Sequence, residues 1–267
     1  MIALPGAVAR SCSPAHVFIT GASSGIGAAL ARCYARRGAH LSLTARNAAR
    51  TETVAQECRE AGAEVRWQAA DVTDRETLSA WIEDCDQRQP IDMVIANAGL
   101  GGERVIASPA GEQLSLAREI VETNILGVAN TVIPLLPRFV ARGSGHVVLM
   151  SSLAAYVGLP EAPLYSASKA AIRIYGQGLH RLLGPSGVRV TVVCPGFVAT
   201  PMSQSIPGHL PLLWSAERAA AFIVKRLARD RREIAFPWPL AVLAKLASTL
   251  PVQLVDSLLD RKRRSPA

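Results

Sequence analysis

The sequence predicts an α/β fold with a doubly wound, seven-stranded parallel sheet that carries helices on both faces. Three observations support it. Short runs rich in β-branched residues alternate with longer stretches of helical periodicity, the pattern of parallel strands joined by crossover helices. A glycine-rich turn follows the first such run. The fourth run, residues 91–96, is almost wholly apolar, as expected of a strand covered on both faces.

Each element follows from this alternation, starting with HVFIT as the first strand. The expected strands are residues 16–20, 40–45, 64–69, 91–96, 146–151, 188–194 and 233–236. The expected helices are residues 26–37, 48–61, 74–88, 112–141, 163–183 and 216–228. Gly62 should end the second helix, and the third should be capped near Thr73. There is no internal repeat or linker, so one domain is predicted over 1–267, with its core at about 15–237.

The composition is that of a globular protein. Of 267 residues, 49% are hydrophobic and 19% charged, which allows a sizeable core. The five cysteines are odd in number and scattered without a Cys-x-x-Cys pair, which argues against a disulfide framework or a metal site and fits a reducing compartment. With neither a signal-peptide pattern nor about 18 uninterrupted apolar residues, a cytoplasmic location is predicted.

The net charge of +8 raises the question of nucleic acid. Residues 1–51 contain six arginines and no acidic residue, and further basic groups lie at 225–232 and 261–264. No nucleic-acid-binding motif accompanies these groups, so a nucleic-acid partner is not predicted.

A glycine-rich turn, TGASSGIG at residues 20–27, joins the first predicted strand to its helix. Glycines let the backbone turn tightly and approach a diphosphate, and the free N–H groups of the helix N-terminus favour an anion. A plain tight turn is the alternative interpretation.

Arg46 ends the second predicted strand, where a dinucleotide's adenosine ribose is expected. A carboxylate there would bind the 2′-hydroxyl of NAD, whereas an arginine accommodates the 2′-phosphate of NADP. No acidic residue lies between Gly27 and Glu52, which favours NADP(H). A solvated surface arginine is the alternative.

Tyr165 and Lys169 are four residues apart, on one face of a predicted helix. A nearby ammonium stabilises a phenolate, so the pKa of Tyr165 is predicted to fall from about 10 toward neutrality. The phenol could then exchange a proton with an alcohol or carbonyl oxygen. Taken alone, this spacing also occurs on ordinary helix surfaces.

Six motifs occur together in a characteristic order. They are TGASSGIG, Asp71-Val72, Asn97-Ala98-Gly99, Ser151-Ser152, Tyr165 with Lys169, and Pro195-Gly196 with Thr200. Over about residues 15–237 the chain thereby resembles the short-chain dehydrogenase/reductase family. The resemblance implies a Rossmann fold and an NADP(H)-dependent oxidoreductase that interconverts a ketone or aldehyde with an alcohol.

The resemblance also implies catalytic roles. Ser152 would bind the substrate oxygen, with Ser151 only part of the strand end. Tyr165 would be the proton donor, and Lys169 would tune it and bind the nicotinamide ribose. Asn124 would hold a water in the proton relay.

The resemblance further implies a set of cofactor contacts. They are Gly21, Ser23, Ser24, Gly25, Ile26 and Gly27 at the diphosphate, Arg46 at the 2′-phosphate, Asp71 and Val72 at the adenine, Asn97 and Gly99 beyond the fourth strand, and Tyr165, Lys169, Pro195, Gly196, Val198 and Thr200 near the nicotinamide. Ser24 stands where some NADP-binding members carry a basic residue, so Arg46 would set the preference almost alone.

Two segments outside these motifs are apolar. Residues 196–215 should overhang the site as a lid, and their apolar side chains suit either a lipophilic substrate or packing of the lid onto the body. Residues 238–263 should form a C-terminal helical extension, two short amphipathic helices around Pro251, that contacts either a membrane surface or a subunit. The family resemblance implies a homodimer or homotetramer through the helices at 112–141 and 163–183.

One rival is a catalytically silent dinucleotide-binding or scaffold protein on the same fold. Such a protein is expected to lack part of the Ser–Tyr–Lys set, which this chain has complete. Dehydratase or epimerase chemistry is a lesser alternative among enzymes.

Overall fold

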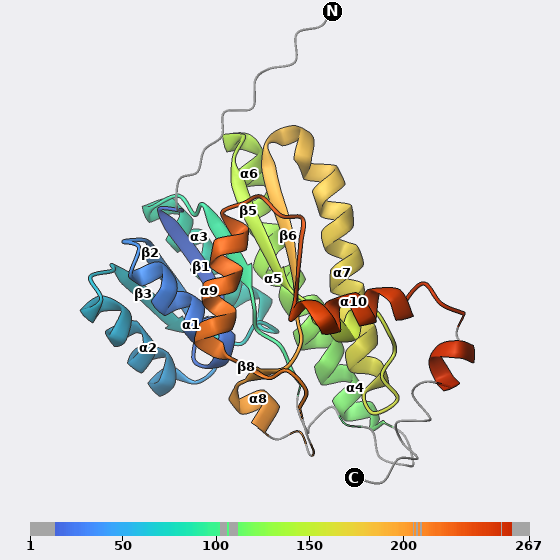
Figure 1. The fold of residues 1–267 in the computed structure, drawn as a ribbon. Coiled ribbons are helices and arrows are strands. Elements are labelled where there is room, and N and C mark those ends of the chain that lie inside the picture. Colours follow the sequence, from blue (N-terminus) through green and yellow to red (C-terminus); the bar gives the residue numbers. More distant parts are fainter. Residues whose placement is uncertain are drawn as a thin grey trace, which may run out of the picture.

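The computed structural model describes residues 14–101, 106, 112–204, 206, 208, 210–251 and 253–257. Its centre is a seven-stranded parallel sheet in the order β3-β2-β1-β4-β5-β6-β9 (Figure 1). The strands are β1 (His16–Thr20), β2 (His40–Ala45), β3 (Val65–Ala69), β4 (Met93–Ala96), β5 (Gly145–Met150), β6 (Val188–Pro195) and β9 (Glu233–Phe236). The order reverses between β1 and β4, so the predicted doubly wound Rossmann fold is confirmed.

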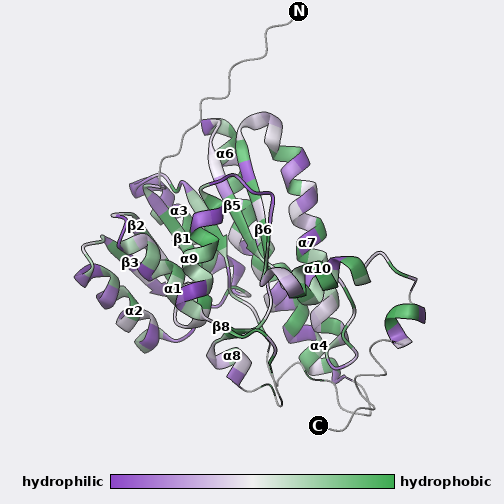
Figure 2. Ribbon diagram, viewed as in Figure 1, coloured by the Kyte–Doolittle hydropathy of each residue, from purple (hydrophilic) through white to green (hydrophobic). Residues whose placement is uncertain are grey.

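Helices cover both faces of the sheet (Figure 1). They are α1 (Gly25–Ala35), α2 (Ala48–Glu60), α3 (Arg75–Arg88), α4 (Leu114–Val121), α5 (Gly127–Val132), α6 (Leu136–Arg142), α7 (Pro163–Leu183) and α9 (Ala216–Leu227). Alternate residues of a strand point to opposite faces, so β1 feeds two separate cores. Val17 and Ile19 pack with α1, α2 and α9, whereas Phe18 packs with α3, α5, α6 and α7. Figure 2 shows the central strands as mainly hydrophobic and the outer helix α2 as mixed.

The long helix predicted at about residues 112–141 is present at Leu114–Arg142. The helix begins at Leu114 and contains a π-helical turn, η2 (Glu122–Leu126), and a 3-10 turn, η3 (Ile133–Leu135). Pro134 lacks an amide hydrogen and so disturbs the regular bonding. The whole helix, Leu114–Arg142, is long and apolar enough to cross a membrane. However, Val132, Leu135 and Phe139 are fully buried against the sheet, as in a core helix.

Beyond β6, the chain forms short elements that the sequence did not predict. Strand β7 (Val198–Ala199) pairs with β8 (Trp214–Ser215), and α8 (Pro201–Gln204) lies between them in the chain. The C-terminal extension matches the prediction in part: α10 (Trp238–Ala247) precedes Pro251, and residues 253–257 are helical after it. Residues 258–263 of the predicted extension lie outside the described residues.

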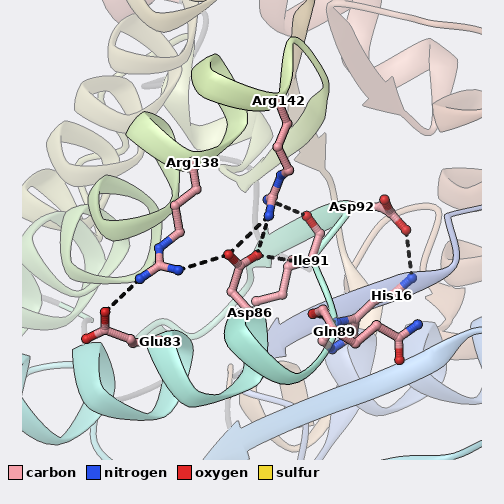
Figure 3. Close-up of polar contacts among 8 residues, drawn as sticks. All are labelled: His16, Glu83, Asp86, Gln89, Ile91, Asp92, Arg138 and Arg142. Carbon is pink, nitrogen blue, oxygen red and sulfur yellow. Dashed lines mark hydrogen bonds and ion pairs between the residues drawn. The ribbon is translucent and has the colours of Figure 1, made fainter.

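A group of paired charges fastens α3 to α6 near the amino end of the sheet (Figure 3). Its centre is the buried carboxylate of Asp86, which accepts from Arg138 Nη1 at 3.2 Å and Arg142 Nη1 at 2.9 Å. The backbone N–H of Ile91 donates to the same carboxylate at 2.8 Å. Every charge in this group therefore has a partner.

Candidate active site

The glycine-rich turn lies at the carboxyl end of β1, where α1 begins. Gly21 and Gly25 have φ values of +66° and +54°, which L side chains rarely adopt. A Cβ on Gly27 would lie 2.3 Å from the Gly21 carbonyl oxygen. Ser24 occupies the N-cap position but makes no side-chain capping hydrogen bond within the described residues. The first N–H groups of α1 therefore remain available to an anion, as a diphosphate site requires.

Asn97 and Thr20 hold this turn against the end of β4. Asn97 Nδ2 donates to the carbonyl oxygens of Thr20 at 3.0 Å and Gly21 at 3.2 Å. Thr20 Oγ1 accepts from the N–H groups of Asn97 and Ala98. The Asn97 side chain thus holds the turn by bonding to the carbonyl oxygens of the turn. Thr20 supports the same contact, a role that the sequence analysis did not assign to it.

Arg46 and Asp71 lie together at the rim of the site. Arg46 Nη1 is 3.8 Å from Asp71 Oδ2, and the Arg46 side chain is 62% exposed. An ion pair this long and exposed is weak, so Arg46 is free to bind a phosphate. Val72 is buried, in the region predicted to flank the adenine.

Helix α7, as predicted, spans residues 163–183 and carries Tyr165 and Lys169 one turn apart. The Lys169 Nζ atom lies 5.7 Å from the centre of the Tyr165 ring and donates to the Met150 carbonyl oxygen at 3.2 Å. Ser152 begins the 3-10 turn η4 (Leu153–Ala155), where its Oγ accepts from the N–H of Ala154 at 3.1 Å. Ser151 Oγ instead donates to the Lys169 carbonyl oxygen at 2.7 Å, which fits a role in the strand end.

The predicted direction of the Tyr165 pKa is wrong. Burial raises this pKa above the usual value, and a hydrogen bond with Ser152 offsets only part of the increase. Burial also lowers the pKa of Lys169, to about 8. Tyr165 is therefore a neutral phenol near pH 7, the form that can donate a proton.

Asn124 lies in the π-helical turn and is completely buried. Its Oδ1 accepts from the N–H of Leu100 at 2.7 Å, and its Nδ2 donates to the Leu100 carbonyl oxygen and to Ser168 Oγ, each at 3.1 Å. Ser168 Oγ in turn donates to the Tyr165 carbonyl oxygen at 2.7 Å. Asn124 thus fastens the loop after β4 to the helix that carries Tyr165.

A Cβ on Gly99 would come within 3.1 Å of Asn124 Oδ1 and 3.3 Å of Lys169 Nζ. Gly99 therefore lies close to two predicted catalytic residues. Sequence reasoning missed Ser168, although it stands inside the Tyr165-to-Lys169 motif.

The segment after β6 contacts both the end of β9 and the glycine-rich turn. Gly196 N–H donates to the Phe236 carbonyl oxygen at 2.6 Å, which places Pro195-Gly196 beside the end of β9. Thr200 lies against the glycine turn, since a Cβ on Gly25 would be 2.9 Å from its Cγ2. Ser203, not predicted, supports this segment by donating to the Val198 carbonyl oxygen at 2.6 Å. The glycine-rich turn and Thr200, one of the residues predicted near the nicotinamide, are thus adjacent.

Comparison with known proteins agrees with this geometry. The family model described as short chain dehydrogenase matches residues 15–210. The chain therefore belongs to the short-chain dehydrogenase family, and it is an oxidoreductase of that family.

Individual relatives cover nearly the whole chain. An uncharacterised oxidoreductase from Myxococcus xanthus is 36% identical over 246 residues, 92% of this chain and 96% of that protein.

Two solved structures also match over more than 90% of this chain and of their own. A short-chain dehydrogenase from Sphingobium yanoikuyae in complex with NADPH is 29% identical, with a TM-score of 0.76 over 94% of this chain and 98% of its own. A bulky-bulky ketone specific alcohol dehydrogenase from Comamonas testosteroni is 25% identical, with a TM-score of 0.75 over 94% and 92%.

Proposed function

We propose that this protein is an NADP(H)-dependent oxidoreductase that interconverts a lipophilic ketone or aldehyde with the corresponding alcohol. The observation that carries the proposal is that Ser152, Tyr165 and Lys169 lie at the same carboxyl edge of the sheet as the uncapped N-terminus of α1. A catalytic set and an anion site at one edge of the sheet are what hydride exchange with a dinucleotide requires.

The bound nicotinamide would supply or accept the hydride, and the protein's side chains manage the charge and the proton. Ser152 and Tyr165 both donate to the carbonyl oxygen, where negative charge grows during reduction. Tyr165 gives up its proton to that oxygen, and its raised pKa keeps it protonated beforehand. Lys169, held by the Met150 carbonyl, stabilises the resulting phenolate and binds the nicotinamide ribose. Asn124 keeps α7 in register with the loop after β4.

The preference for NADP(H) rests on Arg46. Its side chain extends from the end of β2 into solvent, where a 2′-phosphate would lie. The Sphingobium relative was solved with NADPH, which supports the same cofactor class here.

The lid supports a lipophilic substrate. Met202, Leu212 and Leu213 are large apolar side chains that are 41–50% exposed. A Cβ on Gly101 would lie 2.6 Å from Met202 Sδ and 3.3 Å from Tyr165 Cε2, so Met202 stands close to the proposed acid. Trp214, by contrast, stacks on Phe236 at 5.0 Å and serves packing. The ketone specificity of the Comamonas relative is consistent with this class.

Two exposed apolar faces suggest further contacts for an otherwise cytoplasmic enzyme. Leu126 and Ile133, in the helical segment 114–142, and Leu182 on α7 are 52–70% exposed, and we propose that they form a homodimer or homotetramer contact.

On α10, Trp238 and Leu243 are 75% and 62% exposed. With the basic residues at 261–264, this face suits peripheral contact with an anionic membrane.

The test is turnover on a panel of aliphatic and aromatic ketones, with NADPH and NADH oxidation followed separately. We expect NADPH-dependent reduction that improves with the size of the apolar substituents. If the purified protein binds NADPH but reduces no member of the panel and oxidises none of the matching alcohols, the silent dinucleotide-binding alternative replaces the proposal.

A further inference from the structure

A second polar cluster, outside the catalytic set, surrounds Glu233 in β9. Its Oε2 atom accepts from Arg173 Nε of α7 at 2.9 Å, and its Oε1 atom is 2.7 Å from Lys245 Nζ of α10. The Glu233 side chain is only 22% exposed. Such a site is screened less than a surface pair, and one carboxylate here joins two helices.

Tyr156 extends this cluster to the segment that carries Ser152. The Tyr156 ring lies under both cations, with Arg173 Cζ 4.2 Å and Lys245 Nζ 5.7 Å from its centre. Tyr156 follows directly after the 3-10 turn that Ser152 begins. Leu153 of that turn and Ala244 of α10 pack against the apolar cluster that contains Tyr156. Helix α10 therefore contacts the backbone that holds Ser152.

Arg173 extends the cluster to the other catalytic residues. It follows Tyr165 and Lys169 at intervals of four residues, so all three lie along one side of α7. Movement of α7 relative to β9 would displace Tyr165 together with Arg173. The ion pair with Glu233 opposes that movement.

We propose that Glu233 is a positioning residue for the reaction. By holding α7 and α10 together, it keeps Ser152, Tyr165 and Lys169 in place. The proposal rests on the oxidoreductase function proposed above. Because a misplacement of about 1 Å can cost roughly 100-fold in rate, partial loosening should cost about tenfold in kcat. NADPH affinity should stay within about twofold, since the glycine turn and Arg46 belong to other elements.

The variants separate charge from shape. Glu233→Gln keeps the side-chain volume and removes the charge. Lys245→Met removes the ammonium that joins α10 to Glu233 and to the Tyr156 ring, and it leaves the ion pair of Arg173 with Glu233 in place. Lys245→Arg keeps the cation and should restore most of the kcat lost in Lys245→Met. The matched control is Glu57→Gln, which breaks the 2.6 Å ion pair of α2 with Arg32 of α1. The control should change neither kcat nor NADPH affinity.

A second measurement does not depend on turnover. Amide hydrogen exchange should be faster in residues 152–157 and 165–173 of Glu233→Gln and Lys245→Met than in wild type, and unchanged there in Glu57→Gln. If wild type turns over no substrate, the proposed function fails while the exchange data still decide the role of Glu233. Should Glu233→Gln fail to fold, the half-exposed Lys245 carries the test.

Two kinds of result would overturn the proposal. One is kcat within twofold of wild type, or unchanged exchange, in Lys245→Met. The other is an equal loss in Glu57→Gln or no recovery in Lys245→Arg, because general destabilisation would then explain the effect.

Discussion

The two ends of the central sheet differ in whether a buried charge has a charged partner. Near the amino end, Asp86 is surrounded by Arg138, Arg142 and the N–H of Ile91 (Figure 3). At the carboxyl end, Lys169 is only 6% exposed, and among the described residues its ammonium has a backbone carbonyl but no carboxylate. In the first arrangement, removing one partner would leave a buried charge unpaired, which is strongly destabilising. The second leaves a buried charge with a lowered pKa at the edge where we propose that the cofactor and the reacting oxygen bind.

Helix N-termini show a second contrast. Asn47, Asp74 and Ser215 each accept a hydrogen bond from the backbone three residues on, so α2, α3 and α9 are capped. Such a cap stabilises a protein by about 1 kcal/mol. Ser24, at the site, adopts the N-cap position without that bond in the described structure. The helix at the glycine-rich turn thus lacks a stabilising bond that α2, α3 and α9 have.

The largest expected effect is on Tyr165. Removing the hydroxyl in Tyr165→Phe takes away the proton donor, so kcat should fall by about 10²–10⁴-fold. The folding stability should hardly change, which would mark this end as functional rather than structural. Steady-state kinetics at saturating NADPH and thermal unfolding measure the two quantities.

Tyr175→Phe is the matched control, because Tyr175 is a partly buried tyrosine ten residues further along α7. It should leave kcat within about twofold. If Tyr165→Phe retains more than about a tenth of wild-type turnover, another group donates the proton and the assignment is wrong.

The opposite effect is expected at the amino end. Asp86→Ala leaves Arg138 and Arg142 without their shared carboxylate, which should cost about 3 kcal/mol of unfolding free energy, the lower part of the range for broken buried pairs. The arginines are 29–33% exposed, so water recovers part of the loss. Urea unfolding measures this, and kcat of the folded enzyme should be unchanged.

Asp84→Ala is the control, since it removes a carboxylate of the same helix that is 42% exposed and pairs with Arg66 and Arg88. It should destabilise far less than Asp86→Ala. Similar losses in both variants would mean that burial gives Asp86 no special importance, and the contrast between the two ends would fail.

The sequence predicted the regular parts of the fold well because their signals are local. Apolar β-branched runs located β1 to β6 and β9 to within about two residues, and Pro163 and Gly184 bound α7 as expected. Helical spacing paired Tyr165 with Lys169, and the family resemblance added Ser152. These features follow from residues near one another in the chain.

What the sequence missed depends on contacts between distant segments. The π-helical turn at Asn124 is stabilised by bonds to Leu100 and Ser168. The raised Tyr165 pKa reflects burial, which residue spacing does not report. The β8 segment lacks strong periodicity, and pairing with β7 creates it. Each miss is a case in which tertiary structure decides a local outcome.

A smaller effect is expected at the rim of the site. Arg46→Ala should weaken NADPH binding by roughly 10- to 100-fold, since charge-assisted hydrogen bonds contribute about 1.5–3 kcal/mol. NADH lacks the 2′-phosphate and should bind as before. Fluorescence titration with both cofactors measures this, with Arg50→Ala, an exposed arginine of α2, as the control. Equal weakening for NADH and NADPH would assign Arg46 to the fold instead.

The smallest expected effect is the pH dependence of the stability change that the buried Lys169 ammonium causes. Burial lowers the Lys169 pKa from 10.5 to about 8, so folding with a charged Lys169 is unfavourable below about pH 8, and this penalty is relieved as the pH rises toward 10.5. Lys169→Met removes the penalty at every pH. The variant should therefore be more stable than wild type at pH 7, by at most about 3 kcal/mol, although its turnover is lost.

The advantage of Lys169→Met should shrink by about 1 kcal/mol between pH 7 and pH 9, because wild type then releases the proton. Urea unfolding of both proteins at three pH values gives this difference and cancels the titration of groups that they share. A difference that stays constant with pH, or a variant less stable than wild type at pH 7, would show that Lys169 is well solvated in the fold. The carboxyl end of the sheet would then bear no cost for its chemistry.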